Sequence, residues 1–352
     1  MTATPRSFRG TSGRCRGLRC ALFGAGVAMV AALVGCRAGV ERPALPTGVV
    51  AAAAGDQVIV EPDQGIEPIY AWLRAPRRTL DMTMYEIVDD QVVQILIDDA
   101  ARGVRVRVVL DQRLQRAHNQ PAYDRLRSRG VQVVWANRRY AASHQKSFVV
   151  DASVAVVMSL NLTSRYYPNT RDFAVVTSDA ADVAAVGRVF DADFAGRKTA
   201  GGESDDLLWS PGAEAALVAL VDGARTSVFV ETEVLSDRPV LEALSRAARR
   251  GVRVSLTMTY QKDWAANFTA LRNAGVAVTY YRGENPIYIH AKAFVVDSGL
   301  PGARAYLGSQ NLSAASLLRN RELGIVLTDP TTVASVGAVV AKDAAGGLVW
   351  KS

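Results

Sequence analysis

The sequence predicts an α/β fold in which two domains of the same plan follow one another along the chain. Two stretches occur twice: residues 101–106 (ARGVRV) return as 249–254 (RRGVRV), and residues 130–133 (GVQV) return as 275–278 (GVAV). Repeats separated by so many residues indicate that a whole folding unit was duplicated.

Each copy has the pattern of a helix followed by a strand. Residues 92–101 and 240–248 have the apolar period of a helix, a glycine follows each run, and β-branched residues come next. A glycine is typical of a helix C-terminus, and helices alternating with apolar strands are typical of α/β units. We therefore expect a helix-covered sheet in each domain, with the joint near residues 197–212.

The composition is that of a globular protein of about two domains. Of 352 residues, 49% are hydrophobic and 21% are charged. The formal charge of +7 is concentrated at the start, because residues 1–36 hold five arginines and no acid. Without those five, 36 basic side chains (41 less 5) face 34 acidic ones, a balance of +2. This balance gives little support to a general nucleic-acid binder.

The first 36 residues are expected to be a signal peptide of the lipoprotein type. A basic stretch precedes an apolar run that is too short for a comfortable membrane span. The run ends in LVGC, which resembles the bacterial lipoprotein processing box and implies a lipidated Cys36 at the new N-terminus. The alternatives are an ordinary signal peptide cut nearby, or an uncleaved anchor. We expect the segments to be a signal peptide (1–36), a linker (37–55), a first domain (56–200) and a second domain (201–352).

An export signal predicts an extracytoplasmic protein, either anchored to the membrane through Cys36 or otherwise secreted. Cys15 and Cys20 would be removed with the signal peptide, and Cys36 would be modified. No thiol would then remain for a disulfide, a metal site or a nucleophile.

Two of the three histidines begin the same sequence of polar residues. The chain has only six lysines, yet each of these two histidines has a lysine two positions later. In both copies an acid follows the asparagine by eleven positions. The first copy consists of His144, Lys146, Asp151, Ser159, Asn161 and Asp172, and the second of His290, Lys292, Asp297, Ser309, Asn311 and Glu322.

The spacing brings these side chains together. Residues two apart share a face of a strand, so His144 and Lys146 project together, as do Ser159 and Asn161. Residues 148–150 continue the first strand, and a turn returns the chain as an antiparallel partner. Lysine charge and the polar groups of Ser and Asn suit a phosphate oxyanion. An imidazole can attack phosphorus or carry the proton of a leaving alcohol.

The duplicated pattern resembles the signature of the phospholipase D superfamily, H-x-K-x4-D followed by G-S-x-N, and the resemblance covers about residues 56–330. It implies two phospholipase D-like α/β domains with mixed sheets, packed with pseudo-twofold symmetry around one active site without a metal or other cofactor. One histidine would form a phosphohistidine while the other protonates the leaving alcohol, and we expect His144 and His290 in these respective roles. The remaining implied roles are phosphate binding (Lys146, Lys292, Asn161, Asn311), orientation of the histidines (Asp172, Glu322) and structural support (Asp151, Asp297).

One position departs from the signature. Met158 stands where the first copy should have glycine, whereas the second copy keeps Gly308. A side chain there could narrow the site, change the substrate or weaken activity.

Other polar and aromatic residues near the motifs have less definite expectations. We expect His118 in a loop without a catalytic part, because Pro121 follows it closely. Four tyrosines could line a substrate cleft or simply pack: Tyr140, Tyr166, Tyr167 and Tyr288.

The function that these features favour is hydrolysis of phospholipids to phosphatidate and a head-group alcohol by a monomeric enzyme at a membrane surface. The same histidines could instead serve a secreted nuclease, although nucleic acid is not favoured by the charge balance. They could also serve phosphatidyl transfer, as in the cardiolipin synthases of the superfamily. A non-catalytic phosphate-binding relic is the alternative outside enzymes, and Met158 is its only support.

Overall fold

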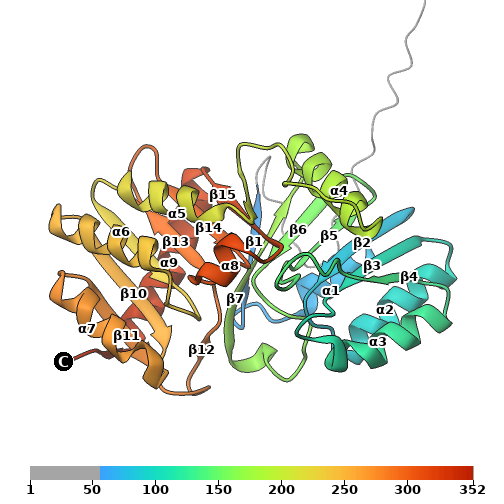
Figure 1. Ribbon diagram of the computed structural model, residues 1–352, viewed down its shortest axis with the longest axis horizontal. Coiled ribbons are helices and arrows are strands. Elements are labelled where there is room, and N and C mark those ends of the chain that lie inside the picture. Colours follow the sequence, from blue (N-terminus) through green and yellow to red (C-terminus); the bar gives the residue numbers. More distant parts are fainter. Residues whose placement is uncertain (1–55, 352) are drawn as a thin grey trace, which may run out of the picture. The chain divides into compact units, whose positions relative to one another are not determined.

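The computed structural model describes residues 56–351, so the predicted signal peptide, the linker and Cys36 lie outside the described residues. Two sheets are flanked by helices, and apart from one short strand the chain completes the first sheet before it enters the second (Figure 1). This arrangement confirms the predicted α/β class with mixed sheets.

The first sheet has the strand order β1–β7–β6–β5–β2–β3–β4, in which β2, β3 and β4 are parallel and the others are antiparallel to their neighbours. Its strands are β1 (Gln57–Glu61), β2 (Thr79–Met84), β3 (Arg105–Leu110), β4 (Gln132–Trp135), β5 (Ser147–Val150), β6 (Val154–Met158) and β7 (Thr170–Thr177). The accompanying helices are α1 (Glu67–Arg74), α2 (Asp90–Ala101), α3 (Arg116–Ser128) and α4 (Ala180–Phe194).

The second sheet repeats this order as β8–β15–β14–β13–β9–β10–β11, with β16 added beyond β11. Its strands are β8 (Leu207–Ser210), β9 (Ser227–Glu231), β10 (Arg253–Thr259), β11 (Ala277–Tyr281), β13 (Ala293–Val296), β14 (Arg304–Gly308), β15 (Glu322–Leu327) and β16 (Leu348–Val349). The accompanying helices are α5 (Ala213–Asp222), α6 (Arg238–Arg249), α7 (Ala265–Asn273), α8 (Ala314–Leu318) and α9 (Pro330–Gly346). The predicted joint, residues 197–212, begins after the end of α4 and includes β8.

Matched local signals form the repeated helices. Asp89 caps α2 by accepting a hydrogen bond from the amide of Gln91, and Asp237 caps α6 in the same way from Val240. Past the other ends of these helices, Gly103 and Gly251 have φ angles of 94° and 88°, which glycine adopts without strain. The repeated sequence thus encodes both the beginning and the end of each helix.

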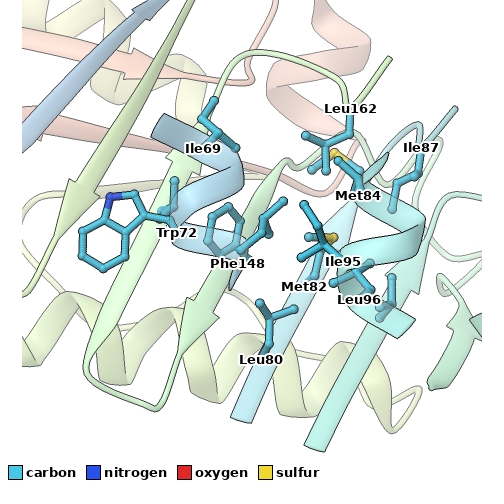
Figure 2. Close-up of a cluster of buried hydrophobic side chains, with 14 of the residues drawn as sticks. Ile69, Trp72, Leu80, Met82, Met84, Ile87, Ile95, Leu96, Phe148 and Leu162 are labelled. Atoms are coloured by element: carbon cyan, nitrogen blue, oxygen red, sulfur yellow. The ribbon is translucent and has the colours of Figure 1, made fainter. Parts of the chain in front are cut away.

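Each half has its own hydrophobic core. In the first, Trp72 of α1, Leu96 of α2 and Phe148 of β5 pack together over the sheet (Figure 2). A third cluster contains side chains from both sheets, among them Val175 of β7 and Ile325 of β15, together with residues of α4 and α9. Apolar side chains of both sheets and of these two helices therefore form one shared interface between the halves.

Crossed ion pairs and strand pairing also join the halves. Arg171 of β7 reaches Asp343 of α9 at 2.5 Å, and Arg321, just before β15, reaches Asp193 of α4 at 2.9 Å. Short strand β12 (Tyr288–Ile289) leaves its own half and pairs with β7. Each half therefore gives an arginine to the other, as the predicted pseudo-twofold packing requires.

Candidate active site

The two predicted hairpins form and carry the motif residues at their ends. His144 and Lys146 immediately precede β5, and Ser159 and Asn161 follow β6. The expectation that His144 lies within the strand was wrong by three residues, since β5 begins at Ser147. The reason is that the amides of His144 and Gln145 donate to the carbonyl of Arg321, in the other half of the protein.

Each histidine is held by a carboxylate from the opposite half. Nδ1 of His144 lies 2.8 Å from Oε2 of Glu322, and Nδ1 of His290 lies 2.8 Å from Oδ1 of Asp172. Both acids are buried. A carboxylate at Nδ1 fixes the proton there and leaves Nε2 free for chemistry. The sequence predicted these acids as partners but did not indicate that they cross between the halves.

The two histidines line one cavity of about 560 Å³. Asn161, Asn311 and Asp172 line the same cavity. Within residues 56–351, Oδ1 of each asparagine is buried without a hydrogen-bond partner. Buried amide groups are normally paired, so these two side chains indicate where a polar ligand completes the structure.

Each motif lysine has its ammonium group near the backbone of its own motif. Nζ of Lys146 donates to the carbonyl of His144 at 2.6 Å, and Nζ of Lys292 donates to the carbonyl of His290. Burial lowers the pKa of Lys146 to about 7, and Lys292 adds to this effect, although Glu322 opposes it. An anionic ligand would stabilise the protonated form.

The surroundings of His144 favour the neutral imidazole. Burial lowers its pKa, and Lys146 acts in the same direction, although Glu322 opposes both. A neutral imidazole that donates Nδ1–H to Glu322 presents a lone pair at Nε2. Burial alone would raise the pKa of Glu322, but His144 and Lys146 outweigh burial and lower it, so this acid stays ionised.

The serines and the motif aspartates lie behind the site. Ser159 donates to Asp172 at 2.5 Å and accepts from the amide of Phe173, so it positions the acid instead of facing a phosphate. Ser309 is likewise buried and accepts from the amide of Leu323. The expectation that both hydroxyls surround the phosphate is therefore not met.

Asp151 and Asp297 anchor backbone at the far ends of the hairpins. Asp151 accepts hydrogen bonds from the amides of Arg77, Arg78 and Thr79 at 2.7–2.9 Å. Asp297 accepts from the amides that precede and begin β9. Both have φ angles near 50°, in the left-handed region that aspartate tolerates better than most residues. This is the structural placement that the resemblance implied.

Met158 does not enter the site. It is fully buried in the core of the first half, where its neighbour across the sheet is Ala174. In the second half, glycines stand at both equivalent positions, and Tyr306 fills the space: a Cβ on Gly308 would lie 2.6 Å from its hydroxyl. The corresponding core space is therefore filled by Met158 in the first half and by Tyr306 in the second half.

Sequence reasoning missed an acid, Glu233, that lies beside Lys292 and His290. Oε2 of Glu233 lies 3.1 Å from Nζ of Lys292 and 3.5 Å from Nε2 of His290. Burial opposes its ionisation, but these cations lower the pKa of Glu233 well below its usual value. The signal was present in the repeat, because the capping residues Asp89 and Asp237 align Glu233 with Tyr85. Tyr85 lies against His144, with ring centroids 4.5 Å apart.

The expected placement of His118 is also wrong. It lies in α3 and not in a loop, it lines the cavity, and its Nδ1 is 2.7 Å from Glu86. Pro121 did not end the helix, because buried Asn119 fixes the first turn through three hydrogen bonds. Of the four tyrosines, three line the cavity (Tyr166, Tyr167, Tyr288). Tyr140 instead bonds Arg321.

Residues 56–351 contain no cluster of His, Cys, Asp and Glu side chains arranged to hold a metal ion. The metal-free mechanism stays a prediction. In the same residues, no helix combines the length and apolar character needed to cross a membrane.

Two duplicated halves that share a cavity, each supplying a histidine held by the other's carboxylate, define an enzyme of the phospholipase D superfamily. Residues 69–194 and 217–343 each match the family described as "Cardiolipin synthase, PLD-like domain". The chain therefore belongs to this family.

Named relatives agree with this assignment. Cardiolipin synthase A of Escherichia coli O157:H7 is 25% identical over 336 residues, covering 80% of this chain and 68% of the relative. Cardiolipin synthase A of Yersinia pestis bv. Antiqua (strain Angola) is 26% identical over 326 residues, covering 78% of this chain and 65% of the relative. The chain thus spans about two thirds of these relatives' length.

Solved structures share the fold. Phosphatidylserine synthase of Haemophilus influenzae Rd KW20 superposes with a TM-score of 0.67 at 14% identity, covering 85% of this chain and 88% of its own. Polyphosphate kinase from Porphyromonas gingivalis superposes with a TM-score of 0.64 at 17% identity, covering 82% of this chain and 50% of its own.

Proposed function

We propose that the protein transfers a phosphatidyl group from a phospholipid to an alcohol through a phosphohistidine, with water as a competing acceptor. The observation that carries this proposal is the crossed arrangement of the histidines. Both line one cavity, and each Nδ1 is engaged by a carboxylate. Two Nε2 atoms are thereby available to the two sides of one phosphorus atom.

The unequal surroundings of the histidines suggest their roles. His144 is buried beside Lys146 and Tyr85, which favours the neutral imidazole of a nucleophile. His290 has Asp172 at Nδ1 and Glu233 at 3.5 Å from Nε2, so a carboxylate lies beside each ring nitrogen, and we assign this histidine the role of general acid.

The reaction then takes two balanced steps. Nε2 of His144 bonds to phosphorus, the bond from phosphorus to the head-group oxygen breaks, and His290 gives its proton to that oxygen. An acceptor hydroxyl next gives its proton to His290 while its oxygen bonds to phosphorus, and the phosphorus–nitrogen bond to His144 breaks. Lys146, Lys292, Asn161 and Asn311 hold the phosphoryl oxygens throughout.

The choice of transfer over hydrolysis rests on the relatives, which are named as synthases. The hydrolysis favoured by the sequence becomes the outcome when water replaces the alcohol in the second step. Lipidation of Cys36, proposed from the sequence alone, would hold this site beside its lipid substrates.

The test uses the full-length protein with vesicles of radiolabelled phosphatidylcholine, with and without glycerol, in the presence of EDTA. We expect new phosphatidyl esters and phosphatidate, and acid-labile label on His144 after rapid quenching. His144→Asn and His290→Asn should each lose at least about 10³-fold of the rate, because nucleophile and acid act as a unit. Glu242→Gln, which changes an exposed acid paired with Arg238, is the control.

Three results would overturn the proposal. Cleavage of single-stranded DNA without lipid turnover would make the protein a nuclease. Activity that EDTA abolishes and a divalent ion restores would exclude the metal-free mechanism. No turnover of either the phospholipid or single-stranded DNA would indicate a non-catalytic phosphate-binding relic.

A further inference from the structure

The cavity is nearly symmetric, but a phosphodiester is not, since its two ester arms differ. Residues that line the cavity in one half and have no equivalent in the other must therefore distinguish the arms. Glu86 is such a residue: the repeat aligns it with Val234, and no histidine of α7 corresponds to His118.

Glu86 and His118 form a fixed carboxylate–imidazole pair. Oε1 of Glu86 lies 2.7 Å from Nδ1 of His118, and Oε2 accepts a hydrogen bond from the hydroxyl of Thr163 at 3.2 Å. The Glu86 side chain is only 8% exposed. Both carboxylate oxygens are thus engaged, and the acid cannot turn away from the imidazole.

The other nitrogen of His118 is available to a ligand. The His118 side chain is 61% exposed and lines the cavity together with Glu86. Within residues 56–351, no hydrogen bond is made by its Nε2. Because the carboxylate holds the proton at Nδ1, Nε2 presents a lone pair that can accept a hydrogen bond.

Tyr85 supplies a donor on the same wall. Its hydroxyl accepts a hydrogen bond from the side chain of Gln115 at 3.1 Å and lines the cavity. Burial raises the pKa of Tyr85 to about 12, so the hydroxyl keeps its proton. An acceptor at His118 and a donor at Tyr85 together match a hydroxyl group, which needs both.

The Glu86–His118 pair is not needed to hold helix α3 in place. Asn119 already ties the helix to the backbone of Tyr85, Ile87 and Asp111 with three hydrogen bonds at 2.8–3.1 Å. A histidine–carboxylate contact with one partner so exposed adds little stability. The buried acid is better explained by orientation of the imidazole toward a ligand.

We propose that Glu86, His118 and Tyr85 form a subsite for the hydroxyl-bearing alcohol, the leaving head group in the first step and the acceptor in the second. This inference rests on the proposed transfer function and assigns the alcohol arm to the first half. The lipid arm then lies away from α3.

The experiment measures the partition between transfer and hydrolysis with phosphatidylcholine vesicles and increasing glycerol, in which transfer gives phosphatidylglycerol and hydrolysis gives phosphatidate. His118→Asn removes the acceptor nitrogen, and Glu86→Gln keeps the shape but loses the charge that holds the tautomer. Each should raise the glycerol concentration for half-maximal transfer about 10-fold or more, the loss expected for one charge-assisted hydrogen bond. Hydrolysis of phosphatidylcholine without glycerol should change less than about 3-fold, since the choline head group has no free hydroxyl for the subsite and the phosphate-binding groups are untouched. Asp124→Asn, an exposed acid on the same helix, should behave as wild type.

The outcomes separate the two proposals. An unchanged partition in both variants, with lipid turnover intact, would overturn the subsite alone. Equal loss of transfer and hydrolysis would also overturn it, because a damaged fold lowers both. Absence of lipid turnover by the wild-type protein would overturn the proposed function and, with it, this inference.

Discussion

Replacing Glu322 with Gln tests whether the carboxylate of one half activates the histidine of the other. Glu322 has no exposed side-chain surface, and its Oε2 lies 2.8 Å from Nδ1 of His144. The amide of glutamine fills the same volume and can still accept from Asn320. It can also turn its NH₂ toward Nδ1, which would place the imidazole proton on Nε2 and remove the nucleophilic lone pair.

The expected loss in kcat is about 10²- to 10⁴-fold, or about 3–5 kcal/mol of activation free energy. The upper figure is that of Asp→Asn in a catalytic triad, where the same tautomer is lost. A second effect adds to it: Glu322 raises the pKa of Lys146, so without the acid this lysine has less positive charge at pH 7. Binding of the phosphate should then weaken as well.

The assay combines rapid-quench measurement of the phosphohistidine with steady-state turnover of phosphatidylglycerol vesicles. Thermal unfolding of the same preparation shows whether the variant remains folded. A folded Glu322→Gln protein that formed the intermediate within about 3-fold of the wild-type rate would refute the argument, since the carboxylate would then contribute almost nothing.

Three further predictions concern stability. The pKa of Glu61 is raised to about 7 by burial and by Asp172, so the folded state holds a proton that the unfolded state loses near pH 4.5, and stability falls as pH rises between these values. Glu61→Gln should therefore raise the melting temperature more at pH 8 than at pH 5, and an equal gain at both would contradict the shift. Arg321→Met should lower the free energy of unfolding in urea by about 3–5 kcal/mol, and adding Asp193→Leu should recover part of this loss. If the losses of the two single variants simply added in the double variant, Arg321 and Asp193 would not interact. Met158→Gly should cost about 2–5 kcal/mol without raising kcat/KM, whereas a more active variant would mean that this side chain narrows the site.

Local spacing predicted those parts of the site that lie on one hairpin. His144 and Lys146 could be placed together because two positions of extended chain share a face, and the β5–β6 turn follows directly. The identity of the partner acid could be predicted from the repeat, but its crossing could not. The contact between His144 and Glu322 depends on how two sheets dock, and no spacing along one chain segment encodes that.

Glu233 and His118 show two other limits. Glu233 stands outside the motif, and only alignment of the two halves through their helix caps reveals that an acid has replaced Tyr85. The polar neighbours of His118 and Pro121 predict a loop, whereas the structure places this histidine in α3. The three buried hydrogen bonds of Asn119 are tertiary contacts, and they outweigh the local preference of proline.

Because each histidine contacts an acid of the opposite half, the order in which the chain is synthesised affects when the active site is assembled. A ribosome completes His144, Lys146 and Asn161 long before it reaches Glu322, and the docking partner of Arg171, Asp343, comes later still. N-terminal domains generally fold first during synthesis. A nascent first half can thus be folded and yet inactive, because Glu322, the acid that contacts His144, has not yet been synthesised. Under the proposed mechanism, the active site is complete only when the whole chain has been synthesised.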